Sequence, residues 1–152
     1  MASDEEQAER ARASALRLLA RREHSRRELE LKLVAREFDR SLIEPLLADL
    51  VASGYLSDER FAEQFSRSRV GRGQGPNRIR AELRERGVSD EFIEFAIAEL
   101  DVSWADLACE VRVSKFGAEA PTDHTSRAKQ SRFLNSRGFS SEQIAIAIRF
   151  SE

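Results

Sequence analysis

Cysteine and proline are scarce in this sequence, and glycine is not abundant. The 152 residues include one cysteine, three prolines and seven glycines. The lone Cys109 excludes an intramolecular disulfide and a thiolate metal cluster within one chain. Because proline and glycine are the residues that disfavour helices most, and because charged residues make up 34% of the chain, the composition favours helices over a sheet protein.

Long apolar runs are also missing. No stretch approaches the roughly 20 apolar residues that a helix needs to span a bilayer. The acidic N-terminus lacks the positively charged start and the apolar core of a signal peptide. We therefore expect a cytoplasmic protein that makes no contact with a membrane.

Groups of residues that could carry catalysis are absent from the sequence pattern as well. The two histidines, His24 and His124, fall in a predicted helix break and at a predicted loop start, with no cysteine or acid at metal-ligand spacing, and we interpret both as solvated. The glycines of residues 71–75 look like a phosphate-binding loop, but they follow a predicted helix instead of a strand. The sequence thus predicts no catalytic residue, no metal site and no cofactor, and we expect that the protein is not an enzyme.

What the sequence does contain is an internal repeat of about 50 residues. Apolar residues recur at matching positions in three copies, and each copy reads as two helices around a tight turn. Leu33, Leu83 and Leu134 occupy equivalent positions, which we predict to be buried. One copy cannot bury its apolar face alone, whereas stacked copies can. The whole chain reads as nine helices, which divide into three groups of three. We therefore expect an all-α fold, an elongated right-handed solenoid-like array of three tandem three-helix repeats.

Helix start and stop signals divide the chain. We expect an acidic disordered tail over residues 1–10, followed by three-helix repeats over residues 11–54, 55–101 and 102–152.

Individual helix ends can also be predicted. The first helix should run over residues 11–22, and the last should end near Phe150. Pro45 lacks a backbone N–H, so the third helix should begin late, near Ser41, or bend at the proline. Ser25, followed three residues later by a glutamate, predicts a capping box at the start of the second helix.

Charge is segregated along the chain although the net charge is only −2. Residues 66–86 contain seven arginines and two glutamates, whereas residues 88–110 contain seven acids and no lysine or arginine. One interpretation is that an anionic partner meets the basic segment and a cationic partner meets the acidic one. The other interpretation is that the two segments neutralise each other within the fold.

Helix spacing within the basic segment selects candidate partner-binding residues. Glu82 lies four residues from both Arg78 and Arg86, so it can neutralise them within one helix. Arg80 and Arg84 are also four residues apart but have no acid at matching spacing, so either an acid on a neighbouring helix or an anionic group of a partner should compensate them. If they are exposed, reversing both charges should change stability little. The candidates are Arg80 and Arg84 first, then Arg69 and Arg72 beside the glycine connector, and Arg78 in the same segment.

Two sequence motifs, which follow each other along the chain, resemble those of a known protein family. Residues 55–62 read Tyr-Leu-Ser-Asp-Glu-Arg-Phe-Ala, and residues 73–88 read Gly-Gln-Gly-Pro-Asn-Arg-Ile-Arg-Ala-Glu-Leu-Arg-Glu-Arg-Gly-Val. Together with residues 22–29 and 132–139, they closely resemble the bacterial RecX regulatory proteins. The resemblance runs over residues 13–150, and a generic helical repeat would not reproduce both strings in order.

The resemblance implies a modulator of the RecA recombinase. Proteins of that family are all-helical, consist of three three-helix repeats and lie in the helical groove of the RecA–DNA filament. There they inhibit filament growth, ATP hydrolysis and strand exchange, and so restrain recombination and the SOS response. The resemblance therefore implies RecA and its nucleoprotein filament as partners, leaves direct contact with DNA open, and leads us to expect a monomer.

Two other functions remain open from the residues alone. Helix pairs joined by tight turns are typical of helix-turn-helix proteins, so the arginines could bind nucleic acid directly. The pI near 5.9 and the few aromatic residues among the arginines argue against this function. A generic repeat scaffold for an unrelated protein is the other alternative. DNA binding without RecA that falls steeply with salt would favour the nucleic-acid binder.

Overall fold

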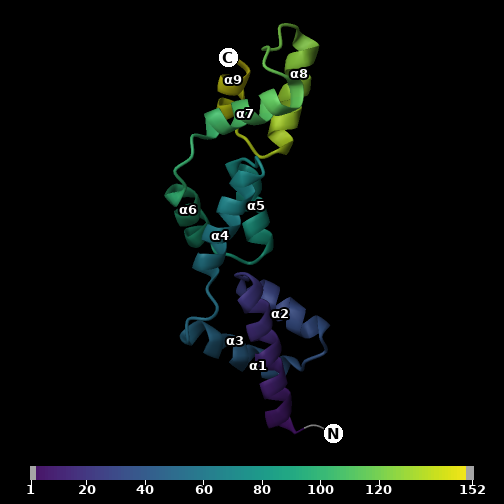
Figure 1. The fold of residues 1–152 in the computed structure, drawn as a ribbon, viewed down its shortest axis with the longest axis vertical. Coiled ribbons are helices and arrows are strands. Elements are labelled where there is room, and N and C mark those ends of the chain that lie inside the picture. Colours follow the sequence, from purple (N-terminus) through teal and green to yellow (C-terminus); the bar gives the residue numbers. More distant parts are fainter. Residues whose placement is uncertain (1–2, 150–152) are drawn as a thin grey trace. The chain divides into compact units, whose positions relative to one another are not determined.

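Figure 1 shows the computed structural model of the chain, which describes residues 3–149. Within those residues the structure contains nine α-helices and no β-strand, which confirms the predicted all-α class. The helices are α1 (Asp4–Arg21), α2 (Arg26–Ala35), α3 (Arg40–Ala52), α4 (Asp58–Gly71), α5 (Pro76–Glu85), α6 (Asp90–Glu99), α7 (Trp104–Phe116), α8 (His124–Ser136) and α9 (Ser141–Arg149). The expected end of the last helix near Phe150 lies outside the described residues.

The chain divides into two compact units. The first unit comprises the chain up to Gln64 together with Leu83–Ile93, and the second comprises Phe65–Glu82 together with the chain from Glu94 onward. Helices α1, α2 and α3 therefore belong to the first unit and α7, α8 and α9 to the second. Helices α4, α5 and α6 each contribute residues to both units, so the division runs through the predicted second repeat.

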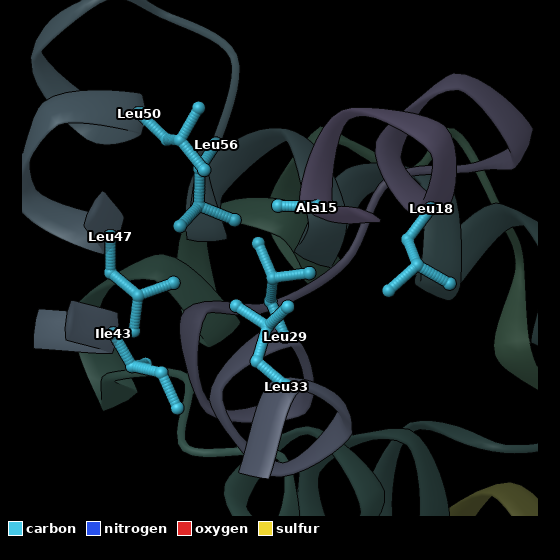
Figure 2. Packing of buried hydrophobic residues seen from close by; sticks show 8 residues of the cluster. All are labelled: Ala15, Leu18, Leu29, Leu33, Ile43, Leu47, Leu50 and Leu56. Atoms are coloured by element: carbon cyan, nitrogen blue, oxygen red, sulfur yellow. The ribbon is translucent and has the colours of Figure 1, made fainter. Parts of the chain in front are cut away.

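The core of the first unit lies among α1, α2 and α3, which pack against one another. In Figure 2 side chains from these helices converge on Leu29 and Leu33 of α2. These two leucines are four residues apart, as are Ile43 and Leu47 of α3, so each helix turns one apolar stripe inward. The buried cluster consists of Ala15, Leu18, Leu29, Leu33, Ile43, Leu47, Leu50 and Leu56.

The second unit has a corresponding core among α7, α8 and α9. Its buried residues are Ala108, Leu134, Phe139, Ile144, Ala147 and Ile148. Leu33, Leu83 and Leu134, which the repeat places in equivalent positions, each have 0% of their surface exposed. The predicted register of the three repeats is therefore confirmed at this position.

Most helix starts follow the signals in the sequence. At the start of α2 the Ser25 hydroxyl accepts a hydrogen bond from the Glu28 amide, and the Glu28 carboxylate accepts one from the Ser25 amide. Ser103 caps α7 in the same way by accepting from the amide of Asp106. Pro76 is the first residue of α5, where a missing N–H leaves no helical bond unmade.

The expectation of a disordered acidic tail over residues 1–10 is wrong from Asp4 onward. Helix α1 begins there because the Ser3 hydroxyl accepts a hydrogen bond from the amide of Glu6 and because three acidic residues lie in the first turn. Carboxylates are stabilising at the positive end of a helix dipole, so the acidic start of the chain is a helix start. Met1 and Ala2 lie outside the described residues.

Helix α3 continues through its proline. It begins at Arg40 with Asp39 as N-cap, close to the expected start at Ser41, and Pro45 lies inside it. Pro45 is exposed, so the proline sits on a face of α3 away from the core.

Three further features of the structure concern membrane spans, metal sites and the single cysteine. None of the helices in residues 3–149 is long and apolar enough to cross a bilayer. Within the same residues, histidine, cysteine and acidic side chains form no group of three that could hold a metal ion. Cys109 is half-buried and packs against the core of α7, α8 and α9.

Candidate partner-binding surface

The five arginines predicted to bind a partner lie on α4, on α5 and in the connector between them. Arg69 lies near the end of α4, Arg72 lies in the connector, and Arg78, Arg80 and Arg84 are on α5. Four of the five form ion pairs with carboxylates. Arg72 is exposed and has no such partner among the residues that the structure describes.

Glu82 joins two of these arginines within the second unit. Its carboxylate lies 3.3 Å from Nε of Arg69 and 3.7 Å from Nε of Arg78. The i, i+4 pair with Arg78 was predicted from helix spacing, whereas the pair with Arg69 joins α4 to α5. The guanidinium of Arg69 also stacks over the ring of Phe65, 4.5 Å from its centroid. Arg69 is therefore held from two sides, and its side chain is only 18% exposed.

Arg80 forms a two-pronged ion pair with Glu94 of α6. Its Nε lies 2.9 Å from Oε2 of Glu94, and its Nη2 lies 3.0 Å from Oε1. A third donor, Nη1, reaches the side-chain oxygen of Asn77 at 3.1 Å. Such parallel bonds fix the plane of the guanidinium, so Arg80 connects α5 to α6.

Arg84 and Arg86 are paired within the first unit. Nε of Arg84 lies 2.9 Å from Oδ1 of Asp90, a residue in the first turn of α6, and both side chains are exposed. Nε of Arg86 lies 3.6 Å from the carboxylate of Glu28 on α2. Arg80 and Arg84, which have no acid at matching spacing on their own helix, are therefore both neutralised by acids of α6. This arrangement agrees with the interpretation that the basic and acidic segments neutralise each other.

Arg72 lines an open cleft of about 790 Å³ in the second unit. Apolar side chains of α4, α7 and α8 form part of its lining, including Val111 and Phe133. Three cationic side chains, of Arg72, Lys115 and Arg137, line the cleft together with one acid, Glu110. The cleft therefore combines an excess of positive charge with apolar surface, which suits an anionic partner surface that also carries apolar groups.

The connector that carries Arg72 is held in place by its backbone. The amide of Gly75 donates to the carbonyl of Arg137 at 2.7 Å, and the guanidinium of Arg137 donates to the carbonyl of Arg72. A Cβ at Gly75 would lie 2.5 Å from the backbone of Gly138, so only glycine permits this approach. These bonds to the α8–α9 turn fix the position of the connector. Sequence reasoning missed Arg137 because it lies 65 residues from Arg72.

His24 is not the solvated residue that was expected. It is only 1% exposed, its Nδ1 lies 3.1 Å from the carbonyl oxygen of Arg22, and its Nε2 lies 3.0 Å from Nζ of Lys32. Since a lysine ammonium can only donate, we assign the ring proton to Nδ1 and the acceptor role to Nε2. Burial lowers the pKa of His24, which favours this neutral form. His124 is exposed as expected, although it is the first residue of α8.

Family models match three successive segments of the chain. The first three-helix domain of RecX matches residues 11–50, the second matches residues 57–97, and the third matches residues 103–148. A regulatory protein RecX from Halorhodospira halophila is 48% identical over 91% of this chain and 86% of that protein. One from Pseudomonas putida is 47% identical over 88% of this chain and 85% of that protein. The chain belongs to the RecX family.

Solved RecX structures share the fold. The crystal structure of RecX from Lactobacillus salivarius matches 94% of this chain and 95% of its own, with a TM-score of 0.78 at 21% identity. A second crystal structure of regulatory protein RecX matches 93% of this chain and 71% of its own, with a TM-score of 0.80 at 21% identity. The predicted three tandem three-helix repeats are thus the three RecX domains, and the names of the relatives state a regulatory role.

Proposed function

We propose that this RecX-family chain binds the RecA–DNA filament in its groove and inhibits filament growth, ATP hydrolysis and strand exchange. In this role it restrains recombination and the SOS response as a stoichiometric regulator in the cytoplasm, acting as a monomer. The observation that carries the proposal is the match of all three RecX domain models, in order, over residues 11–148. Relatives that match at least 88% of the chain and are named regulatory proteins support the same role.

We assign the contact with the filament to the candidate arginines, which are Arg69, Arg72, Arg78 and Arg80 of the second unit and Arg84 of the first. Arg72 ranks first, because it is exposed, lines a cleft that is cationic and partly apolar, and pairs with no carboxylate of residues 3–149. An arginine that is already paired must lose or share its carboxylate before it can bind an anionic group of a partner, and this exchange reduces the net gain. The four paired arginines therefore rank below Arg72.

The ATPase activity of RecA on single-stranded DNA tests the regulatory role directly. We expect the rate of ATP hydrolysis to fall as this protein is added, and to saturate well below one molecule per RecA if it blocks filament ends. An ATPase rate that does not respond to the protein would contradict the proposed function. So would modification or cleavage of RecA or DNA by the protein alone.

The charge reversal Arg72→Glu tests the proposed contact. It should weaken inhibition of the RecA ATPase clearly, because a carboxylate would replace the one candidate guanidinium that has no ion pair within the described residues. Arg17→Glu is the matched control, since Arg17 is exposed on α1 and its reversal changes the net charge by the same amount as Arg72→Glu does. If both variants inhibit as the wild type does, Arg72 is not part of the contact.

Direct nucleic-acid binding is the alternative function, and a salt series separates it from the proposal. Binding to single-stranded DNA without RecA, with an affinity that falls steeply as salt rises, would favour the alternative. Binding that requires RecA or the assembled filament would favour the proposed function.

A further inference from the structure

A groove of about 560 Å³ runs between α8 and α9 in the second unit. Helix α8 lines it with one face, from Arg127 to Asn135, and α9 lines it with residues at positions i, i+3, i+4, i+7 and i+8. Each lining face covers about two helical turns, or roughly 12 Å. Figure 1 shows the two helices as neighbours, and they pack against each other. The groove thus has the shape of a trough between two helices.

The floor of the groove is apolar. Ile144 and Ile148 of α9 are under a tenth exposed and belong to the core of the unit, while Ala145 between them is exposed. The alanine side chain is short, so it leaves the floor open to a partner. The hydroxyl groups of Ser131 and Ser141 also line the groove.

Within residues 3–149, the charged residues that line the groove are all arginines. Arg127, Arg132 and Arg149 are exposed, and the described chain contributes no acidic side chain to the lining. None of the three forms an ion pair with the described part of the chain. Nε of Arg127 donates to the carbonyl of Pro121 at 3.2 Å, which fixes its side chain without neutralising it. Helix α8 itself contains two arginines and a lysine but no acid.

We propose that this groove is a second docking surface, which binds an acidic amphipathic helix of another protein. Apolar side chains of that helix contact Ile144, Ala145 and Ile148, and its flanking carboxylates pair with the three arginines. Helix-in-groove recognition places apolar anchors at i, i+3, i+4 and i+7, and the two-turn length of the floor fits such a set. The surface is separate from the arginines of α4 and α5, so it does not depend on the proposed function.

The lining favours a peptide over a nucleic acid. Phosphates would satisfy the arginines but would leave the apolar floor without a partner. Single-stranded nucleic acids also need aromatic side chains on which bases can stack, and residues 3–149 contribute no aromatic side chain to the groove. An acidic amphipathic helix satisfies both the charge and the floor.

Fluorescence anisotropy with a synthetic probe tests the proposal. The probe is a fluorescein-labelled, stapled helical peptide with leucines at i, i+3, i+4 and i+7 and glutamates elsewhere, and a scrambled peptide of the same composition is its control. We expect the amphipathic peptide to bind about tenfold more tightly than the scrambled one, because only it presents one apolar face.

Two variants locate the binding site. Arg132→Glu and Ala145→Glu should each weaken binding about fivefold or more, the first by removing a rim charge and the second by placing a carboxylate on the floor. Both positions are exposed and glutamate is a good helix former, so circular dichroism should remain unchanged. Arg17→Glu on α1 makes the same charge change as Arg132→Glu outside the groove and should bind as the wild type does.

Four outcomes would overturn the proposal. In the first three, the amphipathic peptide does not bind, the scrambled peptide binds equally well, or Ala145→Glu leaves binding unchanged. In the fourth, a single-stranded oligonucleotide displaces the peptide, and the Arg132→Glu variant no longer binds that oligonucleotide. The last outcome would assign the groove to nucleic acid.

Discussion

Exchanging the charges of Arg80 and Glu94 would separate a structural role of this α5 arginine from a binding role. Replacing Arg80 by Glu removes the two-pronged ion pair and sets two carboxylates against each other. Exposed ion pairs contribute about 0.2–1 kcal/mol. The side chains of Arg80 and Glu94 are 29% and 52% exposed, so solvent screens this pair and keeps it within that range.

The lost attraction and the new repulsion together should cost about 1–2 kcal/mol in the free energy of unfolding. For a chain of this length that corresponds to a fall in Tm of about 2–8 °C. The double variant Arg80→Glu/Glu94→Arg restores opposite charges at the same two positions, so its Tm should recover most of the loss. Thermal unfolding followed by circular dichroism measures all three variants.

Inhibition of the RecA ATPase, measured on the same variants, then assigns the role. If Arg80 contacts an anionic group of the filament, the double variant should inhibit poorly although its stability is restored, because position 80 still carries a carboxylate. If Arg80 serves only to hold α5 to α6, inhibition should recover together with Tm. Two results would refute the reasoning that this ion pair stabilises the fold. They are an unchanged Tm in Arg80→Glu, and a double variant that is no more stable than the single variant.

Three further predictions concern stability and can be checked by urea unfolding. Leu134→Ala should lower the free energy of unfolding by about 2–5 kcal/mol because that side chain is fully buried, whereas Leu31→Ala, at a position 53% exposed, should cost much less. The free energy of unfolding should fall as pH drops from 7 to 5, because burial holds the pKa of His24 below 6.5 and the unfolded chain takes up the proton first. The variant His24→Gln should show a weaker dependence of this free energy on pH. Gly138→Ala should cost more than about 1 kcal/mol, since its φ is +100° and a Cβ would lie 2.4 Å from a side chain of α5. Gly54→Ala should cost less, because it shares the positive φ but has open space around it.

The helices and their starts could be predicted because their causes are local. A cap such as Ser25 with Glu28, or Pro76 in the first turn of α5, depends only on residues within one helical turn. The burial of Leu33 and Leu134 could be predicted for a related reason, since an apolar stripe recurs with the helical period in each repeat.

The two expectations that proved wrong each overlooked the partner of one polar group. The place of His24 in a helix break predicts a solvated side chain, but Lys32 on the next helix supplies a hydrogen bond to its ring and burial favours the neutral ring. The charge of the acidic N-terminus suggests a disordered tail, whereas the capping hydroxyl of Ser3 starts a helix there. In both segments, composition was a poorer guide than the partner of a single polar group.

The ranking of the candidate arginines as partner-binding residues also changes, because it depends on contacts between helices. Spacing rules detect only pairs within one helix, so they recognised the partner of Arg78 but could not choose between an acid of α6 and a foreign anion for Arg80. That choice depends on how the turn after α5 sets α6 beside it, and Glu94 is 14 residues away from Arg80 along the chain. Arg72, which spacing ranked lower, lies in a connector fixed by bonds to Arg137 and has no carboxylate partner within residues 3–149. A guanidinium that has no ion pair within residues 3–149 gives up no carboxylate there when it binds an anion, so mutagenesis of the candidate arginines should begin at Arg72.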